Sequence, residues 1–297
     1  MKKKIFKNQL SIIVGYLRNF IRQIKIVEKG KYYVMNSKMR VVQVVPKHGY
    51  VGDGLMSNHI TDFLYDEKFM NAYKEGKKTG ALKNMADSIR NELYSGDIHY
   101  RAYIACYFAK YCSKLDGDFV ECGVGKALLS KTIVSYLNFA KINKNFFLFD
   151  TFEGIPIHQG KDSEIENMNF MNKIYYNDYS AKEGNYYNDV CKTFLNYPNV
   201  KIIKGIIPES FKDISINKVS YLSIDMNNAF AEIEAIKFFW NKIINYGIIL
   251  LDDYAYGEEF SEQKRSWDEF VKDKNHEILT LPTGQGLIIK TPANRPV

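Results

Sequence analysis

The sequence predicts an α/β protein with a mostly parallel sheet that is covered by helices on both faces. Short apolar runs without polar alternation, typical of buried parallel strands, occur at residues 119–120, 146–149, 200–203, 219–224 and 247–251. Amphipathic stretches separate these runs, and the clearest is 229–244, whose one face carries Ile233, Ile236, Trp240 and Ile243. Two further β-like runs, 276–281 and 286–291, flank the turn-prone Pro282-Thr283-Gly284 and predict an antiparallel hairpin at the sheet edge. The expected sheet therefore has seven strands.

The hydrophobic pattern changes near Asp116 and divides the chain into three predicted parts. Residues 116–297 would form the α/β domain, and residues 51–115 would form a helical cap in which 98–115 is the most regular helix candidate. Residues 1–50 form a basic N-terminal segment. In it, Ile13, Leu17, Phe20 and Ile24 recur at helical spacing between basic residues and predict an amphipathic helix.

Composition and charge limit the classes of partner. The chain has 297 residues, a net charge of +7 and four cysteines at no metal-ligand spacing, which predicts a globular protein of a reducing, cytoplasmic compartment. The basic residues cluster early rather than along an aromatic groove, so we expect no nucleic-acid partner. The N-terminal helix would pack on its own domain or on a second subunit of a homo-oligomer, and peripheral contact with a membrane surface is the alternative.

The first chemical motif is Val120-Glu121-Cys122-Gly123-Val124-Gly125-Lys126-Ala127, directly after a predicted strand. Glycines permit a tight turn and a close approach of the backbone to a ligand, and an acid at the strand end can hold a ligand amino group or a water. Ordinary turn chemistry explains the glycines equally well. The motif is not the Gly-x-Gly-x-x-Gly dinucleotide fingerprint, because Leu128 stands at its last position.

The second motif is Asp150-Thr151-Phe152-Glu153-Gly154-Ile155-Pro156, where the next strand ends in an acid. An acid at this position can accept both ribose hydroxyls of a nucleoside. Alternatively, Asp150 caps the following turn, since aspartate is common there.

Three acids end the last two strands of the predicted parallel sheet. Asp225 follows one strand, and Asp252 and Asp253 follow the next. Carboxylates that meet at one rim repel one another, and a hard cation with oxygen ligands would keep them ionised. The pattern therefore predicts a Mg²⁺ site, although a role for Asp252 or Asp253 in capping a loop stays open.

With these motifs in this order, the chain resembles the macrocin O-methyltransferase-like family of metal-dependent sugar methyltransferases. The family pattern Phe-Val-Glu-Cys-Gly-Val is found at residues 119–124, Asp-Ser/Thr-Phe-Glu-Gly-x-Pro at 150–156, and Asp-Asp-Tyr at 252–254. The similarity runs from about Asp97 to the C-terminus. It implies the class I methyltransferase fold, an S-adenosyl-L-methionine cofactor and a magnesium ion.

Residue by residue, the resemblance implies that Asp225, Asp252 and Asp253 hold Mg²⁺. The residues that it implies for contacts with S-adenosylmethionine are Glu121, Gly123, Gly125, Asp150, Thr151 and Phe152. The chain departs from the family at two points. Many relatives have Trp-Arg-Gly where Gly125-Lys126-Ala127 stands here, and many continue Asp-Gly-Asp where this chain reads Asp225-Met226-Asn227, so that the second carboxylate is an amide.

The expected reaction is methyl transfer to a hydroxyl oxygen, which requires an aligned acceptor and removal of its proton. Asp225 is the first candidate base and His158 the alternative. The helical region before residue 115 and a long loop at 157–185 would roof the acceptor site. Aromatic rings that could stack on a sugar, or pack the loop itself, come from Tyr175, Tyr176, Tyr179, Tyr186 and Tyr187.

Two other functions remain open from the sequence. One is a metal-dependent methyltransferase of phenolic acceptors, although catechol-type enzymes have a lysine where Asn228 stands. The other is a non-catalytic module that binds a nucleoside or an anionic surface.

Overall fold

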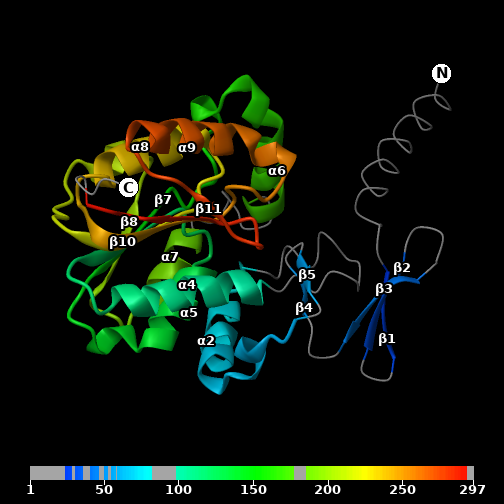
Figure 1. Cartoon of the computed structure of the whole chain (residues 1–297). Helices are drawn as coiled ribbons and strands as arrows, with labels where there is room; N and C mark the ends of the chain where they lie inside the picture. Colours follow the sequence, from blue (N-terminus) through cyan, green and yellow to red (C-terminus); the bar gives the residue numbers. More distant parts are fainter. Residues whose placement is uncertain are drawn as a thin grey trace.

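A seven-stranded sheet forms the centre of the fold, in the strand order β11-β12-β10-β9-β6-β7-β8 (Figure 1). The computed structural model describes residues 24–28, 31–35, 41–46, 50–52, 55–57, 59–81, 98–176 and 185–292. The strands of this sheet are β6 (Asp118–Cys122), β7 (Phe146–Asp150), β8 (Val200–Lys204), β9 (Val219–Ile224), β10 (Ile243–Leu251), β11 (Leu279–Thr280) and β12 (Gly286–Ile289).

The pairing confirms the predicted, mostly parallel sheet with an edge hairpin. Strands β10, β9, β6, β7 and β8 pair in parallel, whereas β12 pairs antiparallel with β10 and with β11. All six residues of β9 are buried, which explains their uninterrupted apolar character. The carboxyl ends of β6, β7, β9 and β10 therefore open at one rim.

Helices cover both faces of the sheet. One apolar cluster joins it to α2 (Glu67–Lys77), α4 (His99–Cys112), α5 (Leu128–Leu137) and α7 (Asn185–Thr193), and another joins the opposite face to α8 (Ala229–Phe239) and α9 (Ser261–Asp273) (Figure 1). Trp240 is buried in the second cluster, as expected of a core residue. The short 3₁₀ helices are η1 (Asp62–Tyr65), η2 (Phe139–Lys141), η3 (Ile157–Gln159), η4 (Glu209–Phe211) and η5 (Glu258–Phe260).

One predicted helix was too long at its C-terminal end. The helix expected at 229–244 ends at Phe239, and Ile243 instead begins β10, where it pairs with Val219. Ile243 continues the helical spacing of Ile236 and Trp240 in the sequence, but its pairing with Val219 places it in the sheet, ahead of a register irregularity between Ile243 and Ile248. Tertiary pairing overrides the local period here.

The segment 157–185 is not the long loop that the sequence predicted. It contains η3 and α6 (Asp162–Tyr176), and residues 177–184 lie outside the described part of the chain. The side chain of Glu164 accepts a hydrogen bond from the backbone of Lys161 (3.0 Å), and it also accepts one from the backbone of Ala229 (2.8 Å). One buried carboxylate thus caps the start of α6 and ties it to the start of α8.

The N-terminal predictions are tested only in part. Residues 1–23, which contain most of the expected amphipathic helix, lie outside the described residues, and Ile24 belongs to a strand. The strands β1 (Ile24–Glu28), β2 (Lys31–Met35) and β3 (Val41–Pro46) pair antiparallel, as do β4 (Tyr50–Gly52) and β5 (Leu55–Ser57). The predicted helical cap 51–115 therefore begins with strands rather than with a helix. Its described α-helices are α2 and α4. Every helix in the described part of the chain is too short or too polar to cross a lipid bilayer.

Candidate active site

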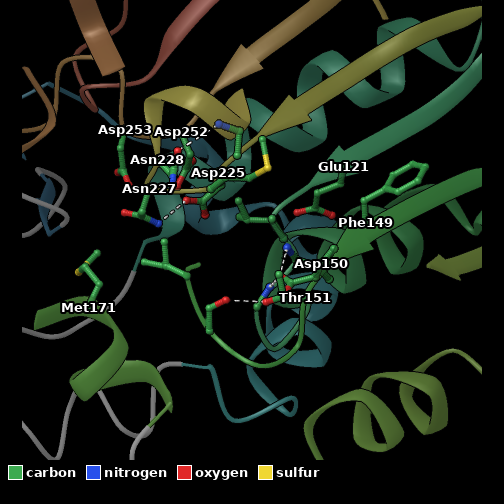
Figure 2. A pocket seen from close by; sticks show the side chains of 18 of the residues that line it. Glu121, Phe149, Asp150, Thr151, Met171, Asp225, Asn227, Asn228, Asp252 and Asp253 are labelled. Carbon is green, nitrogen blue, oxygen red and sulfur yellow. Dashed lines mark hydrogen bonds between the residues drawn. The ribbon is translucent and has the colours of Figure 1, made fainter. Parts of the chain in front are cut away.

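The rim of the sheet brings Asp225, Asp252 and Asp253 together, as their positions after two strands predicted. The parallel ladder continues past the strand ends, with the Asp225 amide donating to the Cys122 carbonyl (2.8 Å) and the Asp252 amide donating to the Ile224 carbonyl (2.9 Å). One carboxylate oxygen of each acid lies within 4.8 Å of the others (Figure 2). These backbone bonds set the spacing of the acids, and the cluster has the all-oxygen donor set that hard divalent cations prefer.

A buried arginine that the sequence analysis did not predict joins this cluster. Arg101 extends from α4 and is only 4% exposed. Its Nη1 lies 2.5 Å from Oδ2 of Asp252 and donates to Oδ1 of Asp253 (3.2 Å) and to the Asp252 carbonyl (2.8 Å). The guanidinium also lies over the ring of Tyr256, 4.8 Å from its centroid. Arg101 therefore holds two of the three acids from the side of α4.

One guanidinium does not neutralise three carboxylates. Burial, followed by repulsion from Asp252 and Asp253, raises the pKa of Asp225 well above its usual range, and the opposing effect of Arg101 is smaller. The cluster keeps an excess of two negative charges when all three acids are ionised. One divalent cation would balance that excess, so the residues present fit such an ion.

Asp252 is fixed on both sides. Its Oδ1 accepts a hydrogen bond from Nε2 of Gln285 (3.0 Å), and Arg101 contacts its Oδ2. Nη2 of Arg101 donates in turn to the carbonyl of Thr283 (3.3 Å), in the turn between β11 and β12. Carboxylate oxygens have two lone pairs each, so Asp252 can keep these bonds and still face the other acids. The edge hairpin thus supports the cluster.

The glycine turn after β6 is built on Asp150. Oδ2 of Asp150 accepts from the amides of Val124 (2.7 Å) and Gly125 (2.8 Å), and its Oδ1 accepts from the amide of Phe152 (2.6 Å). A carboxylate offers about four acceptor positions. Two of these positions hold the turn, one holds the Phe152 amide, and the Thr151 hydroxyl lies 3.5 Å from Oδ1, so little capacity remains for the two ribose hydroxyls that the sequence suggested.

The two glycines of this turn have different roles. A Cβ added to Gly123 would lie 1.8 Å from the Asp225 carbonyl oxygen, whereas one added to Gly125 would meet nothing within 4 Å. Gly123 permits close packing of the ends of β6 and β9, and Gly125 leaves space beside the pocket. Both have positive φ, which favours glycine.

We therefore expect Gly123→Ala to lower the free energy of unfolding much more than Gly125→Ala does. The second change meets only the left-handed backbone penalty of about 1–2 kcal/mol, whereas the first must also push apart two backbone segments. Urea denaturation of both variants measures the difference. Equal losses would show that the contact between Gly123 and Asp225 relaxes freely.

Glu121, at the end of β6, is a buried acid that lines the pocket. It is 3% exposed, and its Oε2 has no hydrogen-bond partner among the described residues. Burial raises the pKa of Glu121 to about 8, with a smaller contribution from repulsion by Asp252 and Asp150. A buried carboxylate oxygen without a partner is unfavourable for the fold alone, so it indicates a polar ligand.

The same shift predicts how stability depends on pH. Because the pKa of Glu121 is raised to about 8 in the folded state from 4.5, its stabilising effect is present below pH 4.5 and is lost as the pH rises through about 8. We expect Glu121→Gln to remove this loss, on the order of 5 kcal/mol at most. Denaturation of the ligand-free wild type and of ligand-free Glu121→Gln at about pH 5 and about pH 9 shows how the free energy of unfolding of each protein changes with pH. The same change with pH in both proteins would contradict the prediction.

A single pocket joins the acids to the glycine turn, with a cavity volume of about 250 Å³. Figure 2 shows Asp225, Asp252 and Asp253 at one side of it, with Asp150 and Thr151 at the other. Four buried polar atoms of its lining residues have no partner among the described residues, namely Oε2 of Glu121, Oε1 of Gln159, Oδ1 of Asn227 and Nδ2 of Asn228. Unmet hydrogen-bonding capacity on this scale points to a polar ligand.

Not every predicted site residue reaches this pocket. Thr151 lines it, but the buried ring of Phe152 packs near Tyr187 (5.4 Å between centroids) and is not part of the lining. His158 is exposed in η3, and the structure does not bring it to the acids. Of the five predicted tyrosines, Tyr186 lines the pocket; the side chains of Tyr175, Tyr176 and Tyr179 lie outside the described residues.

Both predicted roof segments contribute to the lining. Ile98 and Arg101 come from the region before residue 115, and Gln159 and Met171 come from η3 and α6. The available signal for Arg101 was its position four residues before Ala105, on the face of α4 that the structure buries. Nothing in the local pattern indicated Gln159 or Gln285.

Comparisons with known proteins give consistent findings. The family model of macrocin O-methyltransferase (TylF) matches residues 104–280, more than half of the chain. The solved structure of the O-methyltransferase NovP is similar over 76% of this chain and 100% of its own, with a TM-score of 0.57 and 16% identity. The calicheamicin methyltransferase CalS11 is similar over 78% of this chain and 94% of its own, with a TM-score of 0.51 and 11% identity. No curated protein sequence matches the chain.

Proposed function

Since the chain belongs to the macrocin O-methyltransferase family, and is thus an S-adenosylmethionine-dependent O-methyltransferase of the class I fold, we propose that it methylates a hydroxyl of a sugar or glycosylated acceptor with the help of Mg²⁺. The observation that carries the proposal is the convergence of Asp225, Asp252 and Asp253 beside a pocket lined by the glycine turn. The three acids would hold the ion.

The cofactor residues that we propose are those of the β6 and β7 ends. Glu121 offers an unpaired carboxylate oxygen for the amino group of the cofactor. The turn at Gly123 and Gly125 lines the pocket, and Asp150 fixes that turn through two backbone amides. Thr151 lines the same wall. Asp150 would act mainly by shaping the cofactor site.

The proton of the acceptor hydroxyl would pass to Asp225. When bound, a magnesium ion supplies the Lewis acidity that lowers the pKa of a nearby hydroxyl. Arg101 contacts Asp252 and Asp253, whereas Asp225 accepts a hydrogen bond from Nδ2 of Asn227 (3.3 Å). Its remaining oxygen is the proposed base, and the unpartnered Oδ1 of Asn227 would orient the incoming hydroxyl.

Polar and aromatic lining residues favour a sugar over a catechol as the acceptor. Tyr186 and Tyr256 offer ring faces, and Asn227 and Asn228 offer amide groups. Asn228 stands where catechol-type enzymes have a lysine. Its Oδ1 accepts a hydrogen bond from the amide of Ala231 (3.0 Å) and caps α8. A hydroxyl-rich ligand matches the unpaired atoms of the pocket better than a flat phenol does.

The proposal is tested by incubating the protein with S-adenosylmethionine, Mg²⁺ and a panel of nucleotide sugars, glycosides and catechols. We expect a gain of one methylene in the mass of a sugar-containing acceptor, with loss of activity after chelation and recovery with added Mg²⁺. Methylation restricted to catechols would contradict the acceptor class. Activity that survives chelation would contradict the metal, and binding of S-adenosylhomocysteine without any transfer would favour a binding module.

A further inference from the structure

Gln159 is a pocket residue that neither the motifs nor the proposed chemistry uses. It ends η3, and its Nε2 donates to the carbonyl of Ile207 (2.8 Å). That bond defines which end of the amide is the oxygen, because a carbonyl can only accept. Its Oε1 is buried and has no partner in the described part of the chain. The side chain is thus held by one end, and its other end is an unsatisfied acceptor.

The order of the strands indicates which part of the cofactor would lie near Gln159. The three acids of the cluster follow β9 and β10, Glu121 lies at the end of β6, Asp150 ends β7, and Ile207 follows β8. A cofactor whose sulfonium lies near the acids and whose ribose lies near Asp150 must direct its base farther along the rim, toward β8. Figure 2 shows Asp225, Asp252 and Asp253 on one side of the pocket and Asp150 on the other, as this placement of the sulfonium and the ribose requires.

The surroundings of Gln159 suit a purine. Ile155 and Ile207 line the pocket together with it and offer apolar surface for the faces of a base. The exocyclic amine is the donor that adenine presents at its edge. We propose that Oε1 of Gln159 accepts a hydrogen bond from this amine and so selects adenine. The inference rests on the proposed function, since it requires an S-adenosyl cofactor in this pocket.

The experiment compares S-adenosylhomocysteine with its desamino analogue, in which hydrogen replaces the 6-amine of the base. Both ligands are titrated calorimetrically into the wild-type protein and into Gln159→Leu. We expect the wild type to bind the desamino analogue about tenfold more weakly, because a buried acceptor is then left unpaired. Gln159→Leu should bind S-adenosylhomocysteine about tenfold more weakly than the wild type does, and it should no longer distinguish the two ligands.

Asn172 provides a matched control. Its side-chain amide clamps the backbone of Ile155 in the same wall, with Oδ1 accepting from the Ile155 amide (2.7 Å) and Nδ2 donating to the Ile155 carbonyl (3.0 Å). Because both ends of this amide are used within the protein, Asn172→Leu should weaken both ligands by the same factor. Gln159→Met, with a flexible apolar side chain of similar length, repeats the test if Gln159→Leu unfolds.

The possible failures are distinguishable. A wild type that binds neither ligand contradicts the proposed cofactor. A wild type that binds both ligands equally, or a Gln159→Leu variant that weakens both by the same factor, leaves the cofactor in place but overturns recognition of the amine by Gln159.

Discussion

Asp225→Asn is expected to reduce turnover about 10³-fold, the middle of the range for loss of a general base, while the affinity for S-adenosylhomocysteine stays nearly unchanged. The substitution removes both a metal ligand and the proposed base. The glycine turn and Asp150 are bonded to one another, with the Val124 amide donating to the Asp150 carboxylate (2.7 Å), and they do not depend on the Asp225 carboxylate. Steady-state rates and calorimetry with S-adenosylhomocysteine measure the two effects.

Stability separates this effect from misfolding. Repulsion by Asp252 and Asp253 helps to raise the pKa of Asp225, so an uncharged amide of the same shape should not lower the free energy of unfolding. Asp116→Asn is the control, because Asp116 forms an ion pair with Lys218 (2.6 Å) on the exposed surface. Full turnover in Asp225→Asn would show that the acid is neither base nor essential ligand.

Arg101→Met is expected to weaken binding of Mn²⁺, a probe for the magnesium site, by about 10- to 100-fold, as is usual when a group that orients metal-ligating carboxylates is lost. It should also lower the free energy of unfolding by about 3–5 kcal/mol, since buried carboxylates lose their partner. The reason is that Arg101 bonds Asp252 and Asp253 together and ties them to the Thr283 carbonyl. Electron paramagnetic resonance of free Mn²⁺ and denaturant titration measure the two losses.

Two controls define the role of Arg101. Arg101→Lys keeps the charge but not the planar fork, so it should recover part of the stability and little of the metal affinity. Arg265→Met removes an exposed arginine that pairs with Glu262 (3.2 Å), and it should change neither quantity. Tighter Mn²⁺ binding in Arg101→Met would mean that the guanidinium competes with the ion for the acids.

The sheet was readily predicted because its strands are buried on both faces. Continuous apolar runs such as that of β9 leave little ambiguity, and its observed bounds are the predicted ones. Errors arose where a residue could serve two patterns, as at Ile243, or where polar composition concealed a helix, as in α6 with Asn167, Asn169 and Asn172. In both places contacts that are distant in sequence decided the structure.

The predicted site residues fared unevenly, for a physical reason. Asp225 and Asp252 follow strands of one parallel sheet, and parallel strands deliver their carboxyl ends to the same rim, so their meeting required only the order of the elements. His158 and Phe152 follow β7 in loops, where the direction of a side chain depends on local turns. The structure places His158 on the surface and Phe152 in the core.

By itself, the sequence determined the sheet, the rim at which the chemistry gathers and the family to which the chain is similar, because strand burial and the motifs at strand ends are local properties. Only the tertiary structure decided which residues surround the three clustered acids and which backbone groups Asp150 holds. Arg101 lies 151 residues from Asp252, and Gln159 lies 48 residues from Ile207. Contacts between groups so far apart leave no periodicity in the chain, and they exist only once the helices pack on the sheet.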